Sequence, residues 1–441
     1  MIKTLIKKIV PAFLIGYYHF CLSFLAAVFY SFPSRGIKVI GITGTNGKST
    51  TADLTTLILK EAGYKVALLS SVKFQIQECE EPNSLRMTMP GRFFIQRFLR
   101  KAVTEGCQYV VLEVTSEGIK QFRHQFINFE AAVLTNLTPE HIEAHGGFEN
   151  YKKAKGKLFS VAKNIHIINL DDDNANYFLQ FPAKIKYGYG IKISNFPASP
   201  AGRQFPISNQ FSNSKSQIIV AKNPDVAENG LRFFVDDTEF RLKLIGEFNI
   251  YNSLAAICVG ISHGISSDIC KKALEKAEGV PGRMELVISE PFQVFVDYAF
   301  TPNALGKVYQ TLSARLANPQ TNKLICVLGS CGGGRDKWKR PVLGQLAGKY
   351  CKEVIVTNED PYDEDPMEII NQVADGAAGK ARKILDRGQA IREALASARP
   401  NDIVVITGKG SEPSICIAGG KQMPWDDRRV VRAEFKNLTE I

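Results

Sequence analysis

The stretch Gly41-Ile-Thr-Gly-Thr-Asn-Gly-Lys-Ser49 decides the fold of the first half of this chain. It overlaps the end of an apolar stretch, Ile37–Ile42, that is typical of a buried strand, and it leads into a helical pattern over Ser49–Ala62. Glycines let backbone N–H groups surround phosphate oxygens, while Lys48 suits the terminal phosphates and the Ser49 hydroxyl suits Mg²⁺. The sequence therefore predicts a phosphate-binding loop at the start of a helix.

This loop departs from the strict pattern at one position. Ile42 stands where the strict form has glycine, and Gly41 and Gly44 flank it. A glycine-rich turn without a ligand is the alternative, which the strand–loop–helix context disfavours. Because kinases, GTPases and ligases all use such loops, the loop indicates a nucleoside triphosphate and no particular reaction.

Strand and helix patterns alternate beyond the loop. Further buried strands are predicted at Val66–Leu69, Tyr109–Val114, Ala131–Thr135 and Ile165–Asn169. This alternation predicts a parallel sheet with helices on both faces. Residues 190–245 differ, because short alternating stretches predict a small antiparallel insert at Leu231–Val235 and Phe240–Leu244. Two helices are expected after it, over Asn249–His263 and Ser267–Ala277.

A second α/β unit follows a boundary at Gly279, Pro281 and Gly282. Its strands are predicted at Val294–Val296, Leu324–Leu328, Glu353–Val356 and Ile403–Ile406. We therefore expect an α/β protein with an apolar N-terminal helix at 1–36, a central P-loop-type ATP-binding domain at 37–280 and a C-terminal Rossmann-like domain at 281–441.

Composition narrows the class of protein. The 441 residues are 45% hydrophobic and 22% charged, which excludes wholesale disorder, a collagen-like fibre and a polytopic membrane protein. Nine cysteines without a CxxC pair indicate free thiols in a reducing cytoplasm. The net charge of +11 suits nucleic acid, an anionic membrane or a polyanionic substrate. Since there is no nucleic-acid-binding motif and no long Lys/Arg run, we expect no nucleic acid partner.

Residues 9–34 contain no Asp, Glu, Lys or Arg, and three lysines (Lys3, Lys7 and Lys8) precede them. This apolar stretch is long enough to span a bilayer. A signal peptide is disfavoured, because a nucleotide-binding domain follows and no small-residue cleavage site is evident. A spanning helix would place the lysines outside if the remainder stays in the cytosol, against the positive-inside tendency. A helix that docks on the protein or lies on the membrane surface is favoured.

Further motifs follow the loop in a fixed order. They are Leu112–Ile119, Thr135–His141, Tyr151–Lys155, Gly246–Asn252, Gly282–Glu285, Val296–Ala299, Gly332–Lys337 and Gly408–Glu412. Together with Thr43–Ser49 they resemble the Mur ligase family, and within it the tripeptide synthetases that add the third amino acid of the peptidoglycan stem peptide. The resemblance implies that ATP phosphorylates a carboxylate of a muramoyl-peptide precursor. An amino acid's amine then attacks the acyl phosphate.

The resemblance also implies roles for individual residues. ATP would be bound by Gly44, Thr45, Asn46, Gly47, Lys48, Ser49 and Thr50 of the loop and by Asn249, Asn252, Arg283 and Asp297 near the domain boundary. Ser49 and Glu113 would bind one Mg²⁺, while His141 and Lys155 would bind a second, with Lys155 carbamylated. Asn136 would contact the reacting phosphate, which gives a catalytic set of Lys48, Asn136, His141 and Lys155.

The two other substrates are assigned in the same way. The resemblance places the muramoyl peptide at Thr88, Ser116 and Arg123, and the incoming amino acid at Arg335, Asp360, Gly408 and Glu412. Glu412 would receive a side-chain ammonium and Arg335 a carboxylate. Considered without the resemblance, Glu113 is an exposed strand-end carboxylate, His141 a structural histidine and Lys155 part of a solvated helix face.

Four departures from the family pattern bear on substrates. The family's UDP-binding N-terminal domain is missing, so the acceptor is either UDP-linked or lipid-linked. Phe300 replaces a histidine, and Met87-Thr-Met-Pro90 and Glu117 replace other family residues. Tyr362 stands where diaminopimelate-adding members have arginine, which favours lysine or another diamine without a distal carboxylate.

We therefore expect an ATP- and Mg²⁺-dependent ligase of cell-wall precursor synthesis, in the cytoplasm or peripheral on the inner face of the membrane. Two alternatives stay open. One is a related ligase that acts on a lipid-linked precursor or on another carboxylate, as in folylpolyglutamate synthesis. The other is a nucleotide-binding scaffold without ligase activity.

Overall fold

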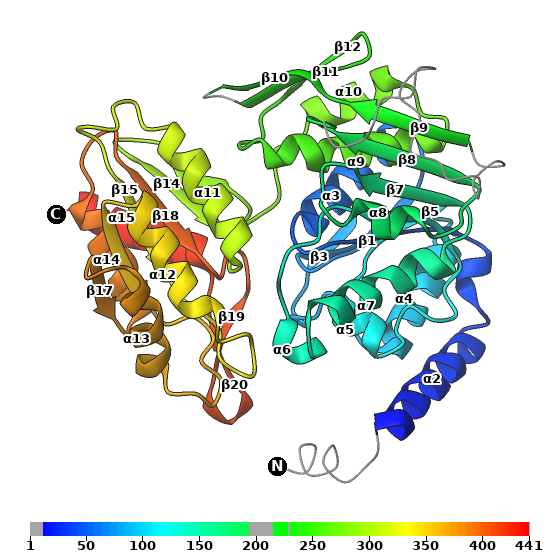
Figure 1. Cartoon of the computed structure of the whole chain (residues 1–441), viewed down its shortest axis with the longest axis horizontal. Coiled ribbons are helices and arrows are strands. Elements are labelled where there is room, and N and C mark those ends of the chain that lie inside the picture. Colours follow the sequence, from blue (N-terminus) through cyan, green and yellow to red (C-terminus); the bar gives the residue numbers. More distant parts are fainter. Residues whose placement is uncertain (1–11, 194–214, 228–229, 441) are drawn as a thin grey trace.

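Two layered α/β domains make up the chain, with a long helix lying along the first domain (Figure 1). The computed structural model describes residues 12–440, apart from 194–214 and 228–229. Lys3, Lys7 and Lys8 and part of the predicted insert thus lie outside the described residues. The predicted α/β class with two successive domains is confirmed.

A nine-stranded sheet forms the centre of the first domain, in the order β4-β3-β2-β5-β1-β6-β7-β8-β9. Its strands are β1 (Lys38–Thr43), β2 (Val66–Leu69), β3 (Lys73–Ile76), β4 (Cys79–Pro82), β5 (Tyr109–Glu113), β6 (Phe129–Leu134), β7 (Ile165–Asn169), β8 (Ile185–Gly190) and β9 (Lys215–Val220). All neighbours from β2 to β9 pair in parallel, whereas β3 and β4 are antiparallel edge strands. The phosphate loop thus follows the central strand of a parallel sheet.

Helices cover both faces of this sheet, as the alternation predicts. One face packs against α3 (Lys48–Glu61), α9 (Phe248–Ser262) and α10 (Ser267–Glu275). The other packs against α4 (Arg92–Thr104), α7 (Phe148–Val161) and α8 (Ala175–Leu179), with the short α5 (Ser116–Lys120) and α6 (Ile142–His145) nearby. Ile40 and Val39 face opposite sides because successive strand residues alternate.

The predicted antiparallel insert is confirmed in part. β10 (Lys222–Ala227), β11 (Gly230–Val235) and β12 (Thr238–Leu242) form a three-stranded antiparallel sheet. Phe233 and Phe240 stack face to face and bury its inner side against α10. The prediction was wrong for β9, which extends the main sheet in parallel by pairing with the open edge of β8.

The second domain has a six-stranded sheet in the order β13-β14-β18-β15-β16-β17. Its strands are β13 (Glu285–Ile288), β14 (Gln293–Asp297), β15 (Leu324–Leu328), β16 (Glu353–Thr357), β17 (Ala381–Ile384) and β18 (Ile403–Thr407). The helices α11 (Pro302–Ala314), α12 (Lys339–Tyr350) and α13 (Pro366–Gly376) cover one face, and α14 (Arg387–Ser397) and α15 (Asp427–Thr439) cover the other. A hairpin of β19 (Ser414–Ile417) and β20 (Lys421–Pro424) extends towards the first domain (Figure 1).

The N-terminal helix α2 (Ala12–Phe29) docks on the first domain beside α4. The Ser23 hydroxyl donates to the carbonyl of Phe122 at 2.9 Å, and the ring of Phe24 packs on Phe126. Tyr17 and Phe29, by contrast, are 69% and 72% exposed. In the described part of the chain no helix is both long and apolar enough to cross a membrane. The expectation of a docked helix is confirmed, and its outer face is apolar.

Candidate active site

A cavity of about 1300 Å³ lies between the two domains. Every residue that the sequence assigns to a site lines this cavity. These are Gly44, Thr45, Asn46, Gly47, Lys48, Ser49, Thr50, Thr88, Glu113, Ser116, Arg123, Asn136, His141, Lys155, Asn249, Asn252, Arg283, Asp297, Arg335, Asp360, Gly408 and Glu412. Residues more than three hundred positions apart thus open into one space.

The phosphate loop joins β1 to α3 through a glycine in the left-handed region. Gly47 has a φ of 80°, and a Cβ there would lie 2.3 Å from Oδ1 of Asn252. The Lys48 ammonium bonds the carbonyl of Thr45 at 2.8 Å, so its stem wraps back over the loop. Burial is the main cause that lowers the pKa of Lys48. A partly exposed lysine on a loop of backbone N–H groups is suited to phosphate oxygens.

Ser49 and Glu113 form an oxygen-rich group beside this loop. The Ser49 hydroxyl donates to Oε2 of Glu113 at 3.0 Å, and the same oxygen accepts the backbone N–H of Ser71 at 2.9 Å. Glu113 is 2% exposed and makes no ion pair with any residue that the structure describes. A buried carboxylate without a cationic partner, next to a hydroxyl, fits a hard cation such as Mg²⁺.

Lys155 is buried on the inner side of α7. Its amine donates to the carbonyl of Gly44 at 2.7 Å and lies 4.8 Å from the centre of the Tyr151 ring. Burial, followed by the charge of Lys48, lowers the pKa of Lys155 well below its usual value. A solvated helix face is therefore the wrong description of Lys155, although it holds for the exposed Lys153. A lowered pKa favours the unprotonated amine, which is the form that reacts with CO₂.

The His141 ring also lies near Tyr151, with the two ring centres 6.2 Å apart. Burial first, and then the charges of Arg335 and Lys339, lower the pKa of His141 to about 2. Its imidazole is therefore neutral and its nitrogen available. Outside the gaps in the description, no group of three or more His, Cys, Asp or Glu is placed to hold a metal ion. A cation bound beside the phosphate loop would therefore take its ligands from Ser49, Glu113, phosphate oxygens and water.

Asn136 braces the loop. Its side chain accepts the N–H of Asn46 at 2.9 Å and donates to the carbonyl of the same residue at 3.0 Å. Tyr151 adds a bond between its hydroxyl and the Thr45 hydroxyl at 3.0 Å. Tyr151 was not singled out from the sequence as a site residue, although the motif that begins with it was.

The residues predicted to bind ATP near the domain boundary are positioned by hydrogen bonds within the protein. Asn252 donates to Asn249 at 2.8 Å, and both residues lie inside α9. Asp297 accepts the N–H groups of Met284 and Ala299 at 2.7 and 2.6 Å, and burial raises the pKa of Asp297. Asp297 therefore shapes the turn that carries Arg283.

Arg283 stacks on Tyr298, with its guanidinium 4.1 Å from the ring centre. Phe300 packs edge-on against Tyr298, and the Lys339 ammonium lies 4.9 Å from the centre of the Phe300 ring. Phe300, which replaces a family histidine, thus lines the cavity and offers its aromatic face to a cation.

One end of the cavity is lined by α5 of the first domain. Ser116 and His145 share a hydrogen bond of 3.2 Å there, and Arg123 donates to the carbonyl of Met89 and, at 2.7 Å, to Gln121. Thr88 lines the same end. This region is the one predicted to hold the muramoyl peptide.

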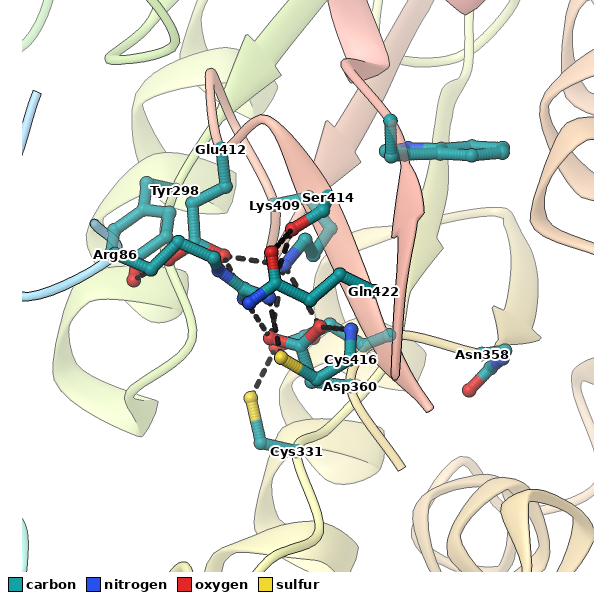
Figure 2. A network of polar contacts seen from close by, with 12 residues as sticks. Arg86, Tyr298, Cys331, Asn358, Asp360, Lys409, Glu412, Ser414, Cys416 and Gln422 are labelled. Carbon is teal, nitrogen blue, oxygen red and sulfur yellow. Dashed lines mark hydrogen bonds and ion pairs between the residues drawn. The ribbon is translucent and has the colours of Figure 1, made fainter. Parts of the chain in front are cut away.

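The C-terminal domain lines a neighbouring part of the cavity, where its charged side chains meet Arg86 (Figure 2). Asp360 accepts two bonds from Lys409 at 3.0 and 2.9 Å and one from Arg86 at 2.7 Å. Glu412 accepts from Arg86 at 3.0 Å and from the Tyr298 hydroxyl at 2.7 Å. The carboxylate expected to receive a substrate ammonium is thus already paired. Arg86 and Lys409 were not predicted, because sequence spacing gives no sign of such distant pairs.

Direct bonds hold the two domains together around the cavity. Asp336 accepts the N–H groups of Ile142 and Glu143 at 3.1 and 3.0 Å, and the Thr301 hydroxyl donates to Asn46 at 3.3 Å. The second domain therefore touches the phosphate loop itself. The structure represents a closed arrangement.

A phosphate loop that faces a second α/β domain across a cavity lined by acidic and basic side chains defines a two-domain ATP-using enzyme. Comparison with known proteins makes this class specific. Residues 42–260 match the Mur ligase middle domain, and residues 282–410 match the Mur ligase, glutamate ligase domain. The chain belongs to the Mur ligase family.

Individual relatives agree with this. The chain is 38% identical over 429 residues to UDP-N-acetylmuramoyl-L-alanyl-D-glutamate--2,6-diaminopimelate ligase of Syntrophomonas wolfei, covering 93% of this chain and 80% of the relative. It is 35% identical to UDP-N-acetylmuramyl-tripeptide synthetase of a Roseiflexus species, covering 97% and 84%.

Solved structures share the fold. A diaminopimelate ligase matches with a TM-score of 0.57 at 28% identity, covering 91% of this chain and 79% of that one. A folylpolyglutamate synthase of Mycobacterium tuberculosis, complexed with ADP and AMPPCP, matches with a TM-score of 0.68 at 16% identity, covering 88% and 92%. The latter shows likeness of fold alone.

Proposed function

We propose that this ATP-dependent carbon–nitrogen ligase joins an amino acid to a muramoyl-peptide precursor in peptidoglycan biosynthesis. One observation carries the proposal: the phosphate loop, the end lined by α5 and the charged side chains of the C-terminal domain open into one cavity. A ligase needs a triphosphate, a carboxylate and an amine within reach of one another.

Two bond exchanges would take place in this cavity. An oxygen of the acceptor's terminal carboxylate takes the terminal phosphoryl group of ATP, and ADP leaves. The amine nitrogen then attacks the acyl carbon, loses a proton, and phosphate departs with one former carboxylate oxygen. Lys48 and Arg283 neutralise phosphate charge during both exchanges. Mg²⁺ bound at Ser49 and Glu113 would supply further positive charge to the phosphates.

We assign supporting roles to three further residues. Lys155, once carbamylated, would provide an anionic oxygen ligand for a second cation, and His141 would provide a nitrogen ligand. Asn136 acts as a positioning residue, because both ends of its amide hold the backbone of Asn46.

The outer face of α2 supports a location on the cytoplasmic surface of the membrane. Tyr17, Leu25 and Phe29 project from the docked helix and are exposed, and the chain carries a net charge of +11. Aromatic and aliphatic side chains on a basic protein suit the interface of an anionic membrane. Sedimentation with anionic vesicles tests this: Leu25→Asp with Phe29→Asp should release the protein, and the exposed remote pair Lys421→Ala with Lys436→Ala should not. Equal sedimentation of both variants would contradict it.

The function itself is tested by phosphate release with a panel of acceptors and amino acids. We expect release only when a muramoyl-dipeptide acceptor and an amino acid are both present, and product mass should show one new peptide bond. Comparing UDP-linked with lipid-linked acceptors identifies the carrier. ATP binding without turnover, unchanged in Lys155→Ala, would instead indicate a nucleotide-binding scaffold.

A further inference from the structure

Four charged side chains form a cluster at the C-terminal end of the cavity (Figure 2). We call Arg86, Asp360, Lys409 and Glu412 the charge cluster. Each carboxylate pairs with both cations: Arg86 lies 2.7 Å from Asp360 and 3.0 Å from Glu412, and Lys409 contacts both as well. The neighbouring Glu359 bonds Cys331 instead and makes no ion pair with these four side chains. Two positive and two negative charges therefore balance.

Arg86 is the member of the cluster that comes from the other domain. It belongs to the segment that leads into Thr88, in the first domain, and its side chain is 9% exposed. Its Nη1 also donates to the Ser414 hydroxyl at 3.3 Å. Its Nε is buried and has no hydrogen-bond partner among the described residues. This guanidinium therefore retains a donor for a further acceptor.

Arg86 also reaches the surroundings of Tyr362. Arg86 donates to the thiol of Cys416, and the backbone N–H of Tyr362 donates to the Cys416 carbonyl at 3.2 Å. Both Arg86 and Tyr362 line the cavity, whereas Lys409 does not. The part of the pocket next to the uncharged Tyr362 is thus supplied with a guanidinium from residue 86.

Charge balance restricts what this pocket can accept. A substrate group with only an ammonium would add an unbalanced positive charge to the neutral charge cluster. An uncharged group would remove water from the cluster without offering its charged side chains a new partner. A group with an ammonium and a carboxylate gives each sign a partner, because the ammonium meets Asp360 and Glu412 while the carboxylate meets Arg86. Arginine suits this task because its guanidinium carries five N–H donors, and Nε of Arg86 has no partner among the described residues.

We infer that Arg86 determines amino-acid specificity by binding a distal carboxylate of the incoming amino acid, whose side chain ends in both an ammonium and a carboxylate, as in 2,6-diaminopimelate. This inference rests on the proposed function. It replaces the expectation from Tyr362 alone, which favoured lysine or another diamine without that carboxylate. The specificity residue lies on the segment that approaches the acceptor site rather than in the C-terminal domain.

The test compares amino acids in the wild type, in Arg86→Met and Arg86→Lys, and in the control Arg97→Met. Arg97 lies in the same domain, is exposed and does not line the cavity. We expect the wild type to prefer diaminopimelate over lysine. Arg86→Met should raise the KM for diaminopimelate about 10- to 100-fold and leave the KM for lysine within about threefold. Arg86→Lys should restore part of the preference, and Arg97→Met should behave as the wild type.

The ratio of the two KM values does not depend on the fraction of folded enzyme, so partial misfolding of a variant does not hide the result. An unchanged ratio in Arg86→Met, or a wild type that prefers lysine, would overturn the inference. A lower KM for lysine in Arg86→Met would also overturn it, since Arg86 would then only obstruct the pocket. If no amino acid is joined, the proposed function fails instead, and calorimetric binding of the two amino acids to the ATP-loaded protein makes the same comparison.

Discussion

Lys339 of the second domain and Glu140 of the first form an ion pair, with Nζ and Oε1 2.9 Å apart. Their side chains are 2% and 3% exposed, so the pair is closed off from water. Burial raises the pKa of Glu140, and Lys339 is the main group that opposes this rise. The pair lies next to Asp336, which caps the start of α6, and thus joins domain closure to the position of His141.

Removing one partner of this pair should harm the closed state more than removing both. Lys339→Met leaves Glu140 buried without its partner, at a cost of about 3–5 kcal/mol. We expect kcat/KM to fall at least about 100-fold for this change, and the double variant with Glu140→Gln to recover much of the loss. Lys337→Met, at an exposed lysine two residues away, is the control. Equal losses in the single and double variants would show that the pair does not control closure.

The phosphate loop should not tolerate a side chain at Gly47. A methyl group there meets Asn252, and the φ of 80° strains any residue with a Cβ. We expect Gly47→Ala to weaken ATP binding at least about 10-fold, because the left-handed conformation alone costs about 1–2 kcal/mol. Gly63→Ala is a matched control, since Gly63 has a similar φ of 86° but open space around it. The loop assignment would be contradicted if the two variants bound ATP with the same affinity.

Lys155 should depend on CO₂. Its buried amine, whose pKa is lowered, is expected to form a carbamate. Lys155→Ala should lower kcat by at least about 100-fold, because it removes a cation ligand and a hydrogen bond to the loop. Removal of CO₂ should slow the wild type, and bicarbonate should restore it. Lys153→Ala, on the exposed side of the same helix, should be active. Carbon-13 spectra with labelled CO₂ detect the carbamate directly, and full activity of Lys155→Ala would refute its role.

Two buried histidines should make stability fall in acid. Burial lowers the pKa of His124 and of His166 to about 4. Between pH 6.5 and 4 the unfolded chain therefore binds more protons than the folded chain, and stability falls as the pH drops through this range. Each histidine should contribute about 2 kcal/mol of this loss by pH 5. Urea unfolding at pH 7.5 and pH 5 measures the loss, and a double change to glutamine should reduce it. An unchanged pH dependence in that variant would contradict the assignment.

Local patterns were enough to predict the elements that hold the nucleotide. The apolar strand before Gly41 and the helix after Lys48 are set by residues close in sequence, so the loop could be placed before the structure was known. Strand β9 and the hairpin of β3 and β4 were missed. Their short segments, such as Cys79–Pro82, carry little apolar alternation, and pairing with an existing sheet edge decides their structure.

Some residues of the candidate site could be predicted from the sequence and others could not. Lys155 was assigned through its motif, although its local surroundings alone indicate a solvated helix face. Arg86 gave no such signal, because its partners Asp360 and Glu412 are 274 and 326 residues away in the chain. Only the folded chain brings the four side chains of the charge cluster together. Their mutual charge balance therefore could not be predicted from their positions in the sequence.

Isotope transfer tests most directly whether the cavity activates a carboxylate with ATP and joins it to an amine. The acceptor is prepared with a heavy oxygen isotope in its terminal carboxylate, and phosphate and peptide product are both analysed by mass spectrometry. The account predicts one labelled oxygen in the released phosphate for each peptide bond formed. Unlabelled phosphate accompanying product, or phosphate released without product, would contradict it.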